Sequence, residues 1–576
     1  SPLPVLLNDY DPNGDVVVID QVESIPDDVG RVDLVADGQA LQVTLTDEAT
    51  GSFEFAYTVS DGRGGTASAS VAITVRAPGE NAAPVQVRAP KTLVAAGSRV
   101  TTNALTTWFD PDGDPFYLVS ATASEPELAL SKPDGTVVFT SSGETTGRAD
   151  VAIVASDGRA EGAGRLSVTV RERDDVPIIA EPFAAVAHVD QEITVSPLAH
   201  ARGGAQAIRL AGVSEEENAA IVPDYDDGTF RFTASAAGTY YLDFSLTDGT
   251  STTAGVARVQ VTTPPAVGES PVAAPHTVFV RSGTPQTVDV LESDRDPAGG
   301  VLLVTDVDDG QVAAALRVEV LAQRSVRVLL GGPLEAPVSF PYTISNGYAS
   351  TTGSITVIEI PEPERPQPPI ATPDSVSVRV GDVVDIPVLD NDEHPDGSPL
   401  TLATELPTGL PEDGGLVFVS GDVVRYLAPA TPGDFTVTYR VAGPDGQWAD
   451  ADVTISVREV DRTSNTPPAP RTVTARVFTG ETVRVEVPLS GIDPDGDSVQ
   501  LVGQSSSPER GAVLASGATW FEYEAGAYAS GTDSFEYTVV DALGAQSTAL
   551  VRIGVAARAD AARNPVAVED LVVTRP

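Results

Sequence analysis

The chain has 576 residues, of which 82 are acidic and 35 basic, giving a net charge of −47 that is spread along the sequence. Such a polyanion repels nucleic acid and anionic lipid, so we expect no nucleic-acid partner and favour cations as ligands, although uniform negative charge also serves simply to keep a long chain soluble. There is no cysteine, which excludes disulfides and thiolate metal sites, and no apolar stretch of about 18 residues that would insert into a membrane.

The first elements in chain order are an acidic loop and two predicted hairpins. The loop N-D-Y-D-P-N-G-D spans Asn8 to Asp15, and the first hairpin spans Val32 to Leu45, turning at Asp37 and Gly38. In the second hairpin, apolar residues alternate with polar ones before and after the turn D-G-R-G-G, which starts at Asp61. A period of two is typical of strands that bury one face against a second sheet.

The closing motif of that hairpin recurs along the chain. Y-T-V-S-D-G returns in degenerate form, with its marker residue at Asp61, Asp157, Asp248, Asn346, Gly443 and Asp541. The spacings are 96, 91, 98, 97 and 98 residues, which predicts six units. We place the units at 1–77, 78–171, 172–263, 264–360, 361–459 and 460–558, with 559–576 as the first strand of a following repeat.

Within each unit, the turn signals and alternating segments predict about seven short strands. In the second unit, K-P-D-G (Lys132 to Gly135) is the counterpart of the first hairpin turn. This pattern is typical of an immunoglobulin-like β-sandwich, here without the disulfide and its companion tryptophan, so we expect packed aliphatic side chains to supply the core. The predicted fold is all-β, with tandem Ig-like sandwiches arranged as an elongated rod.

Short proline-containing segments join the units and favour a semi-rigid string. The joints are Ala77 to Pro84, Arg173 to Pro177, Pro264 to Pro271, Pro361 to Pro369 and Asn465 to Pro470. The first unit lacks a leading strand like that at Val376 to Val380, whereas Asn564 to Pro576 resembles one with no domain after it. We interpret the chain as a slice of a longer protein. Alternatively, that last strand pairs with the first unit of a neighbouring molecule, giving head-to-tail contacts.

These motifs together resemble those of bacterial tandem Ig-like and cadherin-like repeat surface proteins. The resemblance rests on N-D-x-D-P-x-G-D, Y-T-V-S-D-G-x-G-G-T and A-x-V-x-I-x-V at a period near 95 residues, and it is weakest in the third unit, where Ala199 to Gln206 replaces the acidic loop. The scarcity of lysine suggests an actinobacterial source. The resemblance implies an extracellular stalk, adhesin or cell-wall-associated spacer, and many related modules bind calcium.

The acidic loops are candidate calcium sites because carboxylates recur at every second residue around a glycine bend. A second element must complete each cage, and the hairpin turns of the same units offer aspartates for this. The candidate ligands are Asp9, Asp11, Asn13, Asp15, Asp61, Asp110, Asp112, Asp114, Asp157, Asp390, Asp392, Asp396, Asp493, Asp495, Asp497 and Asp541. The alternative is that D-P-D-G is only a favourable type I turn. The fourth loop carries its own Arg295, and we expect no metal there.

No pattern in the sequence predicts catalysis. The four histidines, His188, His200, His276 and His394, lie in different places without metal or triad spacing, and we expect them at the surface or in joints. Trp108 is expected in a core or at its end. We therefore predict a protein that is not an enzyme.

The predicted role is an extracellular stalk or adhesin segment at the cell surface or cell wall, with a cell-surface or cell-wall ligand and the option of calcium stiffening. One alternative is a carbohydrate-binding or hydrolytic surface protein, with its site in the divergent third unit near Glu215 to Asn218 and Tyr225. Another is a self-assembling filament, formed by strand exchange or by lateral packing.

Overall fold

The computed structural model describes residues 3, 5–35, 38–46, 49–75, 81–204, 208–225, 228–263, 268–310, 312, 314–334, 336–363, 365–460, 463 and 465–558. Strands dominate this part of the chain, and its only helices are short 3-10 turns. These turns are η1 (Val5–Asn8), η3 (Arg173–Asp175), η4 (Pro197–His200) and η5 (Val290–Glu292). No helix among the described residues has the length and apolar character needed to cross a membrane.

The fourth, fifth and sixth units each contain a four-stranded and a three-stranded sheet. The fourth unit has β24 (His276–Val280), β25 (Gln286–Asp289), β26 (Leu303–Val307), β27 (Leu316–Leu321), β28 (Ser325–Leu330), β29 (Val338–Ser345) and β30 (Ser350–Glu359). The fifth has β31 (Asp374–Arg379), β32 (Val383–Ile386), β33 (Thr401–Leu402), β34 (Leu416–Ser420), β35 (Val423–Leu427), β36 (Gly433–Ala442) and β37 (Trp448–Arg458). The sixth has β38 (Val473–Phe478), β39 (Thr482–Glu486), β40 (Val499–Gln504), β41 (Gly511–Ser516), β42 (Trp520–Ala525), β43 (Gly531–Asp541) and β44 (Gln546–Ala556).

The second and third units have the same two sheets and one further two-stranded pair each. The second unit has β6 (Val85–Gln86), β7 (Lys91–Ala95), β8 (Arg99–Asn103), β9 (Trp108–Phe109), β10 (Tyr117–Thr122), β11 (Leu128–Ser131), β12 (Thr136–Thr140), β13 (Gly147–Ser156) and β14 (Glu161–Arg171). The third has β15 (Ile178–Ala180), β16 (Phe183–His188), β17 (Ile193–Val195), β18 (Ala201–Gly203), β19 (Arg209–Val213), β20 (Ala219–Asp224), β21 (Thr229–Ala234), β22 (Gly238–Thr247) and β23 (Thr252–Thr262).

The first unit is smaller, with a three-stranded sheet β1-β4-β5 and a pair β2-β3. Its strands are β1 (Val18–Val22), β2 (Gly30–Val35), β3 (Ala40–Leu45), β4 (Gly51–Ser60) and β5 (Thr66–Val75). In each of the other five units, a leading strand runs parallel to the last strand, as β38 does beside β44. Every other pairing within the sheets is antiparallel, so the predicted hairpins are confirmed, with the turn residue Asp37 lying outside the described part.

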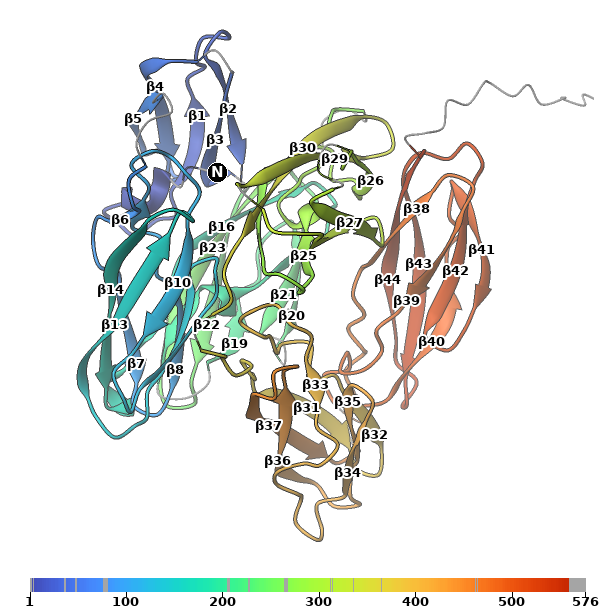
Figure 1. The fold of residues 1–576 in the computed structure, drawn as a ribbon. Coiled ribbons are helices and arrows are strands. Elements are labelled where there is room, and N and C mark those ends of the chain that lie inside the picture. Colours follow the sequence, from blue (N-terminus) through green and yellow to red (C-terminus); the bar gives the residue numbers. More distant parts are fainter. Residues whose placement is uncertain are drawn as a thin grey trace, which may run out of the picture.

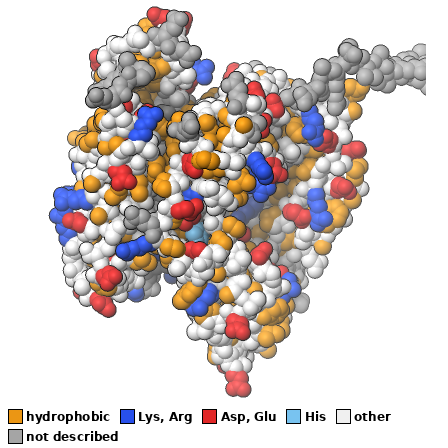
Figure 2. Space-filling model, in the orientation of Figure 1, with side chains coloured by type: hydrophobic (Ala, Val, Ile, Leu, Met, Phe, Trp, Pro, Cys, Tyr) orange, Lys and Arg blue, Asp and Glu red, His pale blue; other side chains and the backbone are white. Residues whose placement is uncertain are grey.

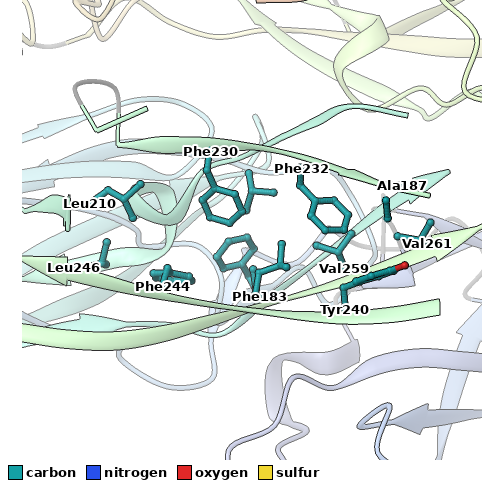
Figure 3. Close-up of a cluster of buried hydrophobic side chains, with 14 of the residues drawn as sticks. Phe183, Ala187, Leu210, Phe230, Phe232, Tyr240, Phe244, Leu246, Val259 and Val261 are labelled. Carbon is teal, nitrogen blue, oxygen red and sulfur yellow. The ribbon is translucent and has the colours of Figure 1, made fainter. Parts of the chain in front are cut away.

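The cores lie between the two sheets of each unit, where alternation places every second side chain. The third unit shows that this holds even where the sequence diverges, because Phe230 and Phe232 of β21 face Phe244 and Val259 of the other sheet (Figure 3). Aromatic side chains supply much of the buried volume, since the largest fully buried residues are tyrosines and phenylalanines. Our expectation that packed aliphatic side chains supply the core was therefore too narrow, and Trp108, which is 7% exposed, does belong to the core. The predicted all-β tandem sandwich fold is confirmed.

Buried tyrosines anchor the start of several acidic loops. The hydroxyl of Tyr342 lies 3.0 and 2.9 Å from the two carboxylate oxygens of Asp294 and donates to the carbonyl of Ala274 at 2.8 Å. Tyr439 contacts Asp392 in the same way at 3.1 Å, and Tyr57 donates to Asp9 at 2.8 Å. These aspartates hold the loop onto the core because a buried hydroxyl requires a hydrogen-bond partner.

Consecutive units meet end to end, with the leading strand of one unit ending on the loop of the next. At the joint between the fifth and sixth units, the backbone N–H of Arg379 donates to the carbonyl of Gly496 at 3.0 Å. Gly496 has φ +81°, and a Cβ there would lie 2.7 Å from the backbone of Ser377 and Val378. The bend therefore requires glycine twice, for its left-handed conformation and for the close approach of the preceding unit.

The string of units also winds, so that units two places apart touch (Figure 1). Arg258 on β23 of the third unit donates to the carbonyls of Val16 at 3.0 Å and Ser60 at 2.8 Å in the first unit. Arg552, which follows a buried valine on the last strand β44, donates to the carbonyl of Gly299 in the fourth unit at 2.6 Å. The units are thus joined end to end in a string that winds back on itself. No local pattern in the sequence predicted this winding.

Two of the four histidines lie in the interior. His188 and His394 are buried, at 7% and 5% exposure, and are not surface residues. His188 borders the loop of the fourth unit, since a Cβ on Gly299 would lie 3.0 Å from its ring. The predicted last strand at Asn564 to Pro576 lies outside the described residues.

Candidate metal centre at the acidic loops

The acidic loop of the sixth unit connects β39 to β40 and lies at the same end of the sandwich as the turn between β43 and β44. The N–H of Gly496 donates to the carbonyl of Asp493 at 3.0 Å, which closes the Asp-Pro-Asp-Gly turn. Asp493 Oδ1 accepts the N–H groups of Asp495 at 2.9 Å and Asp497 at 3.1 Å. The local turn that the alternative interpretation requires is therefore present, and it uses only one carboxylate oxygen of Asp493.

The other oxygen of Asp493 points into a buried acidic cluster. Asp493 Oδ2 is buried without a hydrogen-bond partner among the described residues. One oxygen each of Asp493, Asp497 and Asp541 lies within 4.8 Å of the others, and the three residues are 3%, 7% and 5% exposed. Burial, followed by the charges of Asp497 and Asp541, raises the pKa of Asp493 to about 6. A carboxylate in this position is costly unless a cation or proton neutralises it.

An asparagine from the joint completes the cluster. Asn465 Nδ2 donates to Asp541 Oδ2 at 2.7 Å, while its Oδ1 is buried without a partner among the described residues. Asp541 Oδ1 accepts backbone N–H groups from Leu543, Gly544 and Ala545. Two buried oxygens, of Asn465 and Asp493, are thus left without donors beside two further aspartates. Hard oxygen ligands of this kind are what calcium requires.

The preceding unit balances part of the charge. Arg379, at the end of β31, has its guanidinium 3.0 Å from Asp497 and 3.7 Å from Asp495, with side-chain exposures of 6% for Arg379 and 2% for Asp497. The three clustered carboxylates, Asp495 and this guanidinium together carry a formal net charge of −3. A divalent cation would offset most of that charge.

The second unit repeats the turn and the asparagine contact, whereas the cluster of three carboxylates is found only in the sixth unit among the described residues. Asp110 Oδ1 accepts the N–H groups of Asp112 at 2.8 Å and Asp114 at 3.1 Å, and Asp110 Oδ2 is again buried without a partner among the described residues. Asn81 Nδ2 donates to Asp157 Oδ2 at 2.8 Å, and Asn81 Oδ1 is likewise unpartnered. The Asp114 side chain is more open, at 43% exposure, with Arg159 at 3.9 Å. The same two oxygens are therefore left free at both loops.

The fourth unit shows the same turn with an internal substitute for the cation. Asn346 stands at the hairpin-turn position and donates its Nδ2 to Asp296 Oδ1 at 2.9 Å. Asp296 Oδ2 accepts the N–H of Gly300 at 2.7 Å, so both of its oxygens have donors. We expected this loop to need no metal because of Arg295, and that stays a prediction. The donor that the structure gives to Asp296 Oδ1 is the amide of Asn346.

The first and fifth units bring together fewer of the candidate residues. Asp11 Oδ1 accepts the N–H groups of Asn13 at 2.7 Å and Asp15 at 3.3 Å, and Arg63 lies 3.3 Å from Asp15. Asp61 caps its own turn by accepting the N–H groups of Arg63 and Gly65. Among the candidates of this unit, Asp9 instead binds the tyrosine hydroxyl described above.

In the fifth unit, His394 occupies the position that Asp493 has in the sixth. The N–H of Gly397 donates to the carbonyl of His394 at 2.8 Å, closing an H-P-D-G turn. Asp396 pairs with Arg281 of the fourth unit at 2.7 Å. Asp392 binds Tyr439, and Asp390 is exposed, so neither of them joins the turn. An arginine from the preceding unit thus meets this loop as well.

The third unit has no acidic loop, and η4 and β18 take its place. Tyr225, the suspected sugar contact, is 51% exposed beside Asp224, and residues 226 and 227 of the suspected loop lie outside the described part. Asp224 pairs with Arg471 of the sixth unit at 3.2 Å. Nothing in this arrangement singles out a carbohydrate site.

Comparison with protein families finds bacterial Ig domains at residues 1–74, 81–170, 269–358, 366–456 and 465–554, which leaves out the third unit. A comparison with curated protein sequences finds no match. Both candidate sites, with Asn81 and Asn465 included, fall within matched segments.

Among solved structures, the human Desmocollin-1 ectodomain is similar, with 10% identity over 82% of this chain and 99% of that one, and a TM-score of 0.14. The N-terminal eight Ig domains of Down Syndrome Cell Adhesion Molecule are 14% identical over 94% of this chain and 81% of that one, with a TM-score of 0.20. An endo-fucoidan hydrolase of glycoside hydrolase family 107 is 17% identical over 49% of this chain and 43% of that one, with a TM-score of 0.16. Scores this low carry no information on ligands or chemistry.

Proposed function

Because the chain belongs to the bacterial Ig domain family, we propose that it is a non-enzymatic stalk or adhesin segment of a bacterial surface protein, stiffened at its acidic loops by calcium. The role is extracellular, at the cell surface or cell wall. Tandem sandwiches joined end to end supply reach, and the high negative charge suits an environment rich in divalent cations.

The observation that carries the calcium proposal is the pair of unpartnered buried oxygens on Asn465 and Asp493. Buried polar atoms in folded proteins nearly always have partners. The same pair occurs on Asn81 and Asp110, whereas in the fourth unit Asn346 donates to Asp296, which has no unpartnered buried oxygen. A cation at the second and sixth loops would satisfy both oxygens and link the joint segment to the hairpin turn.

The mechanical consequence follows from where the ligands lie. Asn465 belongs to the joint, Asp493 and Asp497 to the loop, and Asp541 to the hairpin turn. An ion shared by these three segments restrains the joint relative to the sandwich, because any rotation of the joint pulls one ligand away. Arg379 restrains the same loop from the preceding unit.

Single-molecule stretching of the whole chain, in calcium and then in chelator, tests the role. We expect stepwise unfolding of the sandwiches in both conditions, with calcium raising the force at which some of the units open. Replacing Asp493 and Asp110 by Asn should remove the calcium effect and leave the unfolding steps. A chain that extends without discrete steps contradicts the stalk, and identical force traces in calcium and chelator contradict the stiffening.

A further inference from the structure

The winding of the chain brings units three places apart into contact. The segment that opens the fifth unit lies on the second unit, where Arg99 of β8 donates to the carbonyl of Ala371 at 2.6 Å. Gln367 of the same segment exchanges two hydrogen bonds with the backbone of Ser131. Both contacts join a polar side chain of one unit to the backbone of another.

The segment that opens the sixth unit lies on the third unit. Arg231 of β21 donates to the carbonyl of Pro470 at 2.9 Å, and Thr472 donates to Glu192 at 3.1 Å. The two arginines stand on different strands of their units, so these are separate contacts and not copies of one docking pattern. They share only their chemistry, a guanidinium bound to a backbone carbonyl.

Units two places apart are joined by the same chemistry. Arg258 and Arg552 donate to carbonyls of the first and fourth units, as described above. Arg476 of β38 also donates to the carbonyl of Leu302 in the fourth unit at 2.7 Å. A carbonyl that loses such a donor regains a hydrogen bond from water when the units separate, so each bond contributes little net stability.

Apolar contact between units two or three places apart is small. The buried clusters that join such units have three members each, namely Tyr117, Ile358 and Ile360 between the second and fourth units, and Leu130, Val138 and Ile370 between the second and fifth. The cores of the second to sixth units contain 13 to 15 buried residues each. Because hydrophobic stabilisation grows with the apolar area buried, each sandwich is far more stable than the contacts that wind the string.

Open space remains where distant units meet. A cavity of about 840 Å³ lies between the second, fourth and fifth units, which contribute Lys132, His276 and His394 to its wall. Another of about 280 Å³ lies between the third, fourth and sixth units and is bordered by His188 and Arg476. The interior of a folded domain is close-packed, with few voids larger than a water molecule. The winding contacts are therefore packed less completely than the cores.

The electrostatic balance also favours separation. Each of the six units has more acidic than basic residues, and acidic side chains are spread over several units of the face shown in Figure 2. Like charges repel across gaps shorter than the Debye length, about 10 Å at 0.1 M ionic strength. Lys132 pairs with Glu393 at 2.9 Å and Arg471 with Asp224 at 3.2 Å across the contacts, but all four side chains are partly exposed, and such pairs contribute little.

We propose that the winding is an elastic element, which opens reversibly by separating units two and three places apart before any sandwich unfolds. Consecutive units stay joined, because their joints hold buried ion pairs such as that of Arg379 with Asp497. The longest strands have 10 or 11 residues at about 3.3 Å each, so six units in line would span about 200 Å. The inference goes beyond the stalk proposal, because it adds a reversible extension that does not depend on calcium.

Small-angle scattering of the whole chain in chelator tests the contacts without force. Arg99→Ala with Ile370→Ser removes the contact of the second and fifth units, and Arg231→Ala with Thr472→Ala removes that of the third and sixth. The variant with all four changes should have a larger maximum dimension than the parent chain, shifted towards about 200 Å. Its circular dichroism should match the parent, since none of these side chains belongs to the core cluster of a sandwich. Arg484→Ala is the control, because Arg484 pairs with Glu486 at the surface and should leave the dimension unchanged.

Optical tweezers, also in chelator, test the elasticity. We expect the parent chain to lengthen reversibly, with superimposed stretching and relaxation curves, at forces below the first unfolding step. The variant with all four changes should lengthen at lower force and keep the unfolding steps of the parent. A parent chain with no reversible extension before the first step, an unchanged maximum dimension in that variant, or an equal effect of Arg484→Ala would each overturn the proposal. These outcomes leave the unfolding steps and the calcium effect unaltered, so the stalk proposal depends only on its own test.

Discussion

Arg379 of the fifth unit and Asp497 of the sixth form a buried ion pair across the joint, with 3.0 Å between Nη2 and Oδ2. The pair lies on one edge of the acidic cluster and leaves Asp493 and Asp541 without a cation of their own. One loop is thereby shared between a neighbouring unit and the proposed ion. The position of the joint therefore determines how much of the buried negative charge in the loop is balanced by Arg379.

Calcium should stabilise the sixth unit through Asp493. Binding to the folded loop alone raises the free energy of unfolding by mass action, about 2.7 kcal/mol at 100 times the dissociation constant. Titration calorimetry of the whole chain should show calcium binding at the sixth and second units. Asp493→Asn should remove only the site in the sixth unit, and Asp110→Asn only the site in the second. Asp296→Asn in the fourth unit is the matched control, because Asn346 already satisfies that loop. Unchanged calcium binding in both loop variants would mean that the loops are acidic turns only.

Asn465→Ala should weaken calcium binding at the sixth unit while leaving its acidic turn intact. The substitution removes the unpartnered Oδ1 and the hydrogen bond to Asp541, but it leaves Asp493, Asp495 and Asp497 in place. The expected result is a higher dissociation constant by calorimetry, with the second-unit site unaffected. Asn391→Ala is a control, since Asn391 is an exposed loop asparagine that contacts Asp374. Equal loss of binding in the control would point to a general effect of the substitutions.

Arg379→Ala should destabilise the sixth unit in chelator. Removing one partner of a buried ion pair leaves an uncompensated charge and costs about 3 to 5 kcal/mol. The three remaining carboxylates should then gain more from calcium than they do in the parent chain, so the calcium-induced rise in melting temperature should increase. Arg484→Ala is the control, because Arg484 pairs with Glu486 at the surface, where both side chains are more than half exposed and such pairs contribute about 0 to 1 kcal/mol.

The sequence predicted what repeats locally and missed what depends on distant partners. Alternation before the turn at Asp61 predicted a strand that buries one face, and Phe55 and Tyr57 on that strand are buried. It did not find Asn81 and Asn465, because they lie in joints, 76 residues before Asp157 and Asp541, to which they donate. Their shared position at the start of N-A-A-P and N-T-P-P was the available signal.

Other features have weaker signals. His394 stands where other units have aspartate, and aligning its H-P-D-G with their D-P-D-G would have shown this. The acidic run D-N-D just before it instead led us to choose Asp390 and Asp392 as ligands. The winding depends on single side chains such as Arg258, which meet partners about 200 residues away in sequence. No periodicity in the sequence encodes such contacts.

The pH dependence of stability should reverse on adding calcium. The folded pKa of Asp493 is raised to about 6 from an ordinary value of 3.8, so the folded chain binds more protons than the unfolded chain between these values. Without calcium, the stability that the protonated group contributes is present below pH 4 and is lost as the pH rises through 6. With calcium, which requires the carboxylate, stability should rise over the same range. Thermal melts of the parent chain and Asp493→Asn should differ in this slope, and identical slopes would contradict the assignment.

Tyr342→Phe should destabilise the fourth unit with no effect on calcium binding. The hydroxyl of Tyr342 lies within hydrogen-bonding distance of both oxygens of Asp294, whose side chain is fully buried, and of the carbonyl of Ala274, and its single proton is shared among these acceptors. Removing it leaves a buried carboxylate with one fewer donor, a cost of about 1 to 3 kcal/mol. The N–H of Ala274 still donates to Asp294, so the loop should keep its shape while the free energy of unfolding falls. Tyr348→Phe, at a position 45% exposed, is the matched control and should change stability little. If chemical denaturation showed equal stability for the two variants, the tyrosine and aspartate pair would not anchor the loop, and the shared position of Asp9, Asp294 and Asp392 would need another explanation.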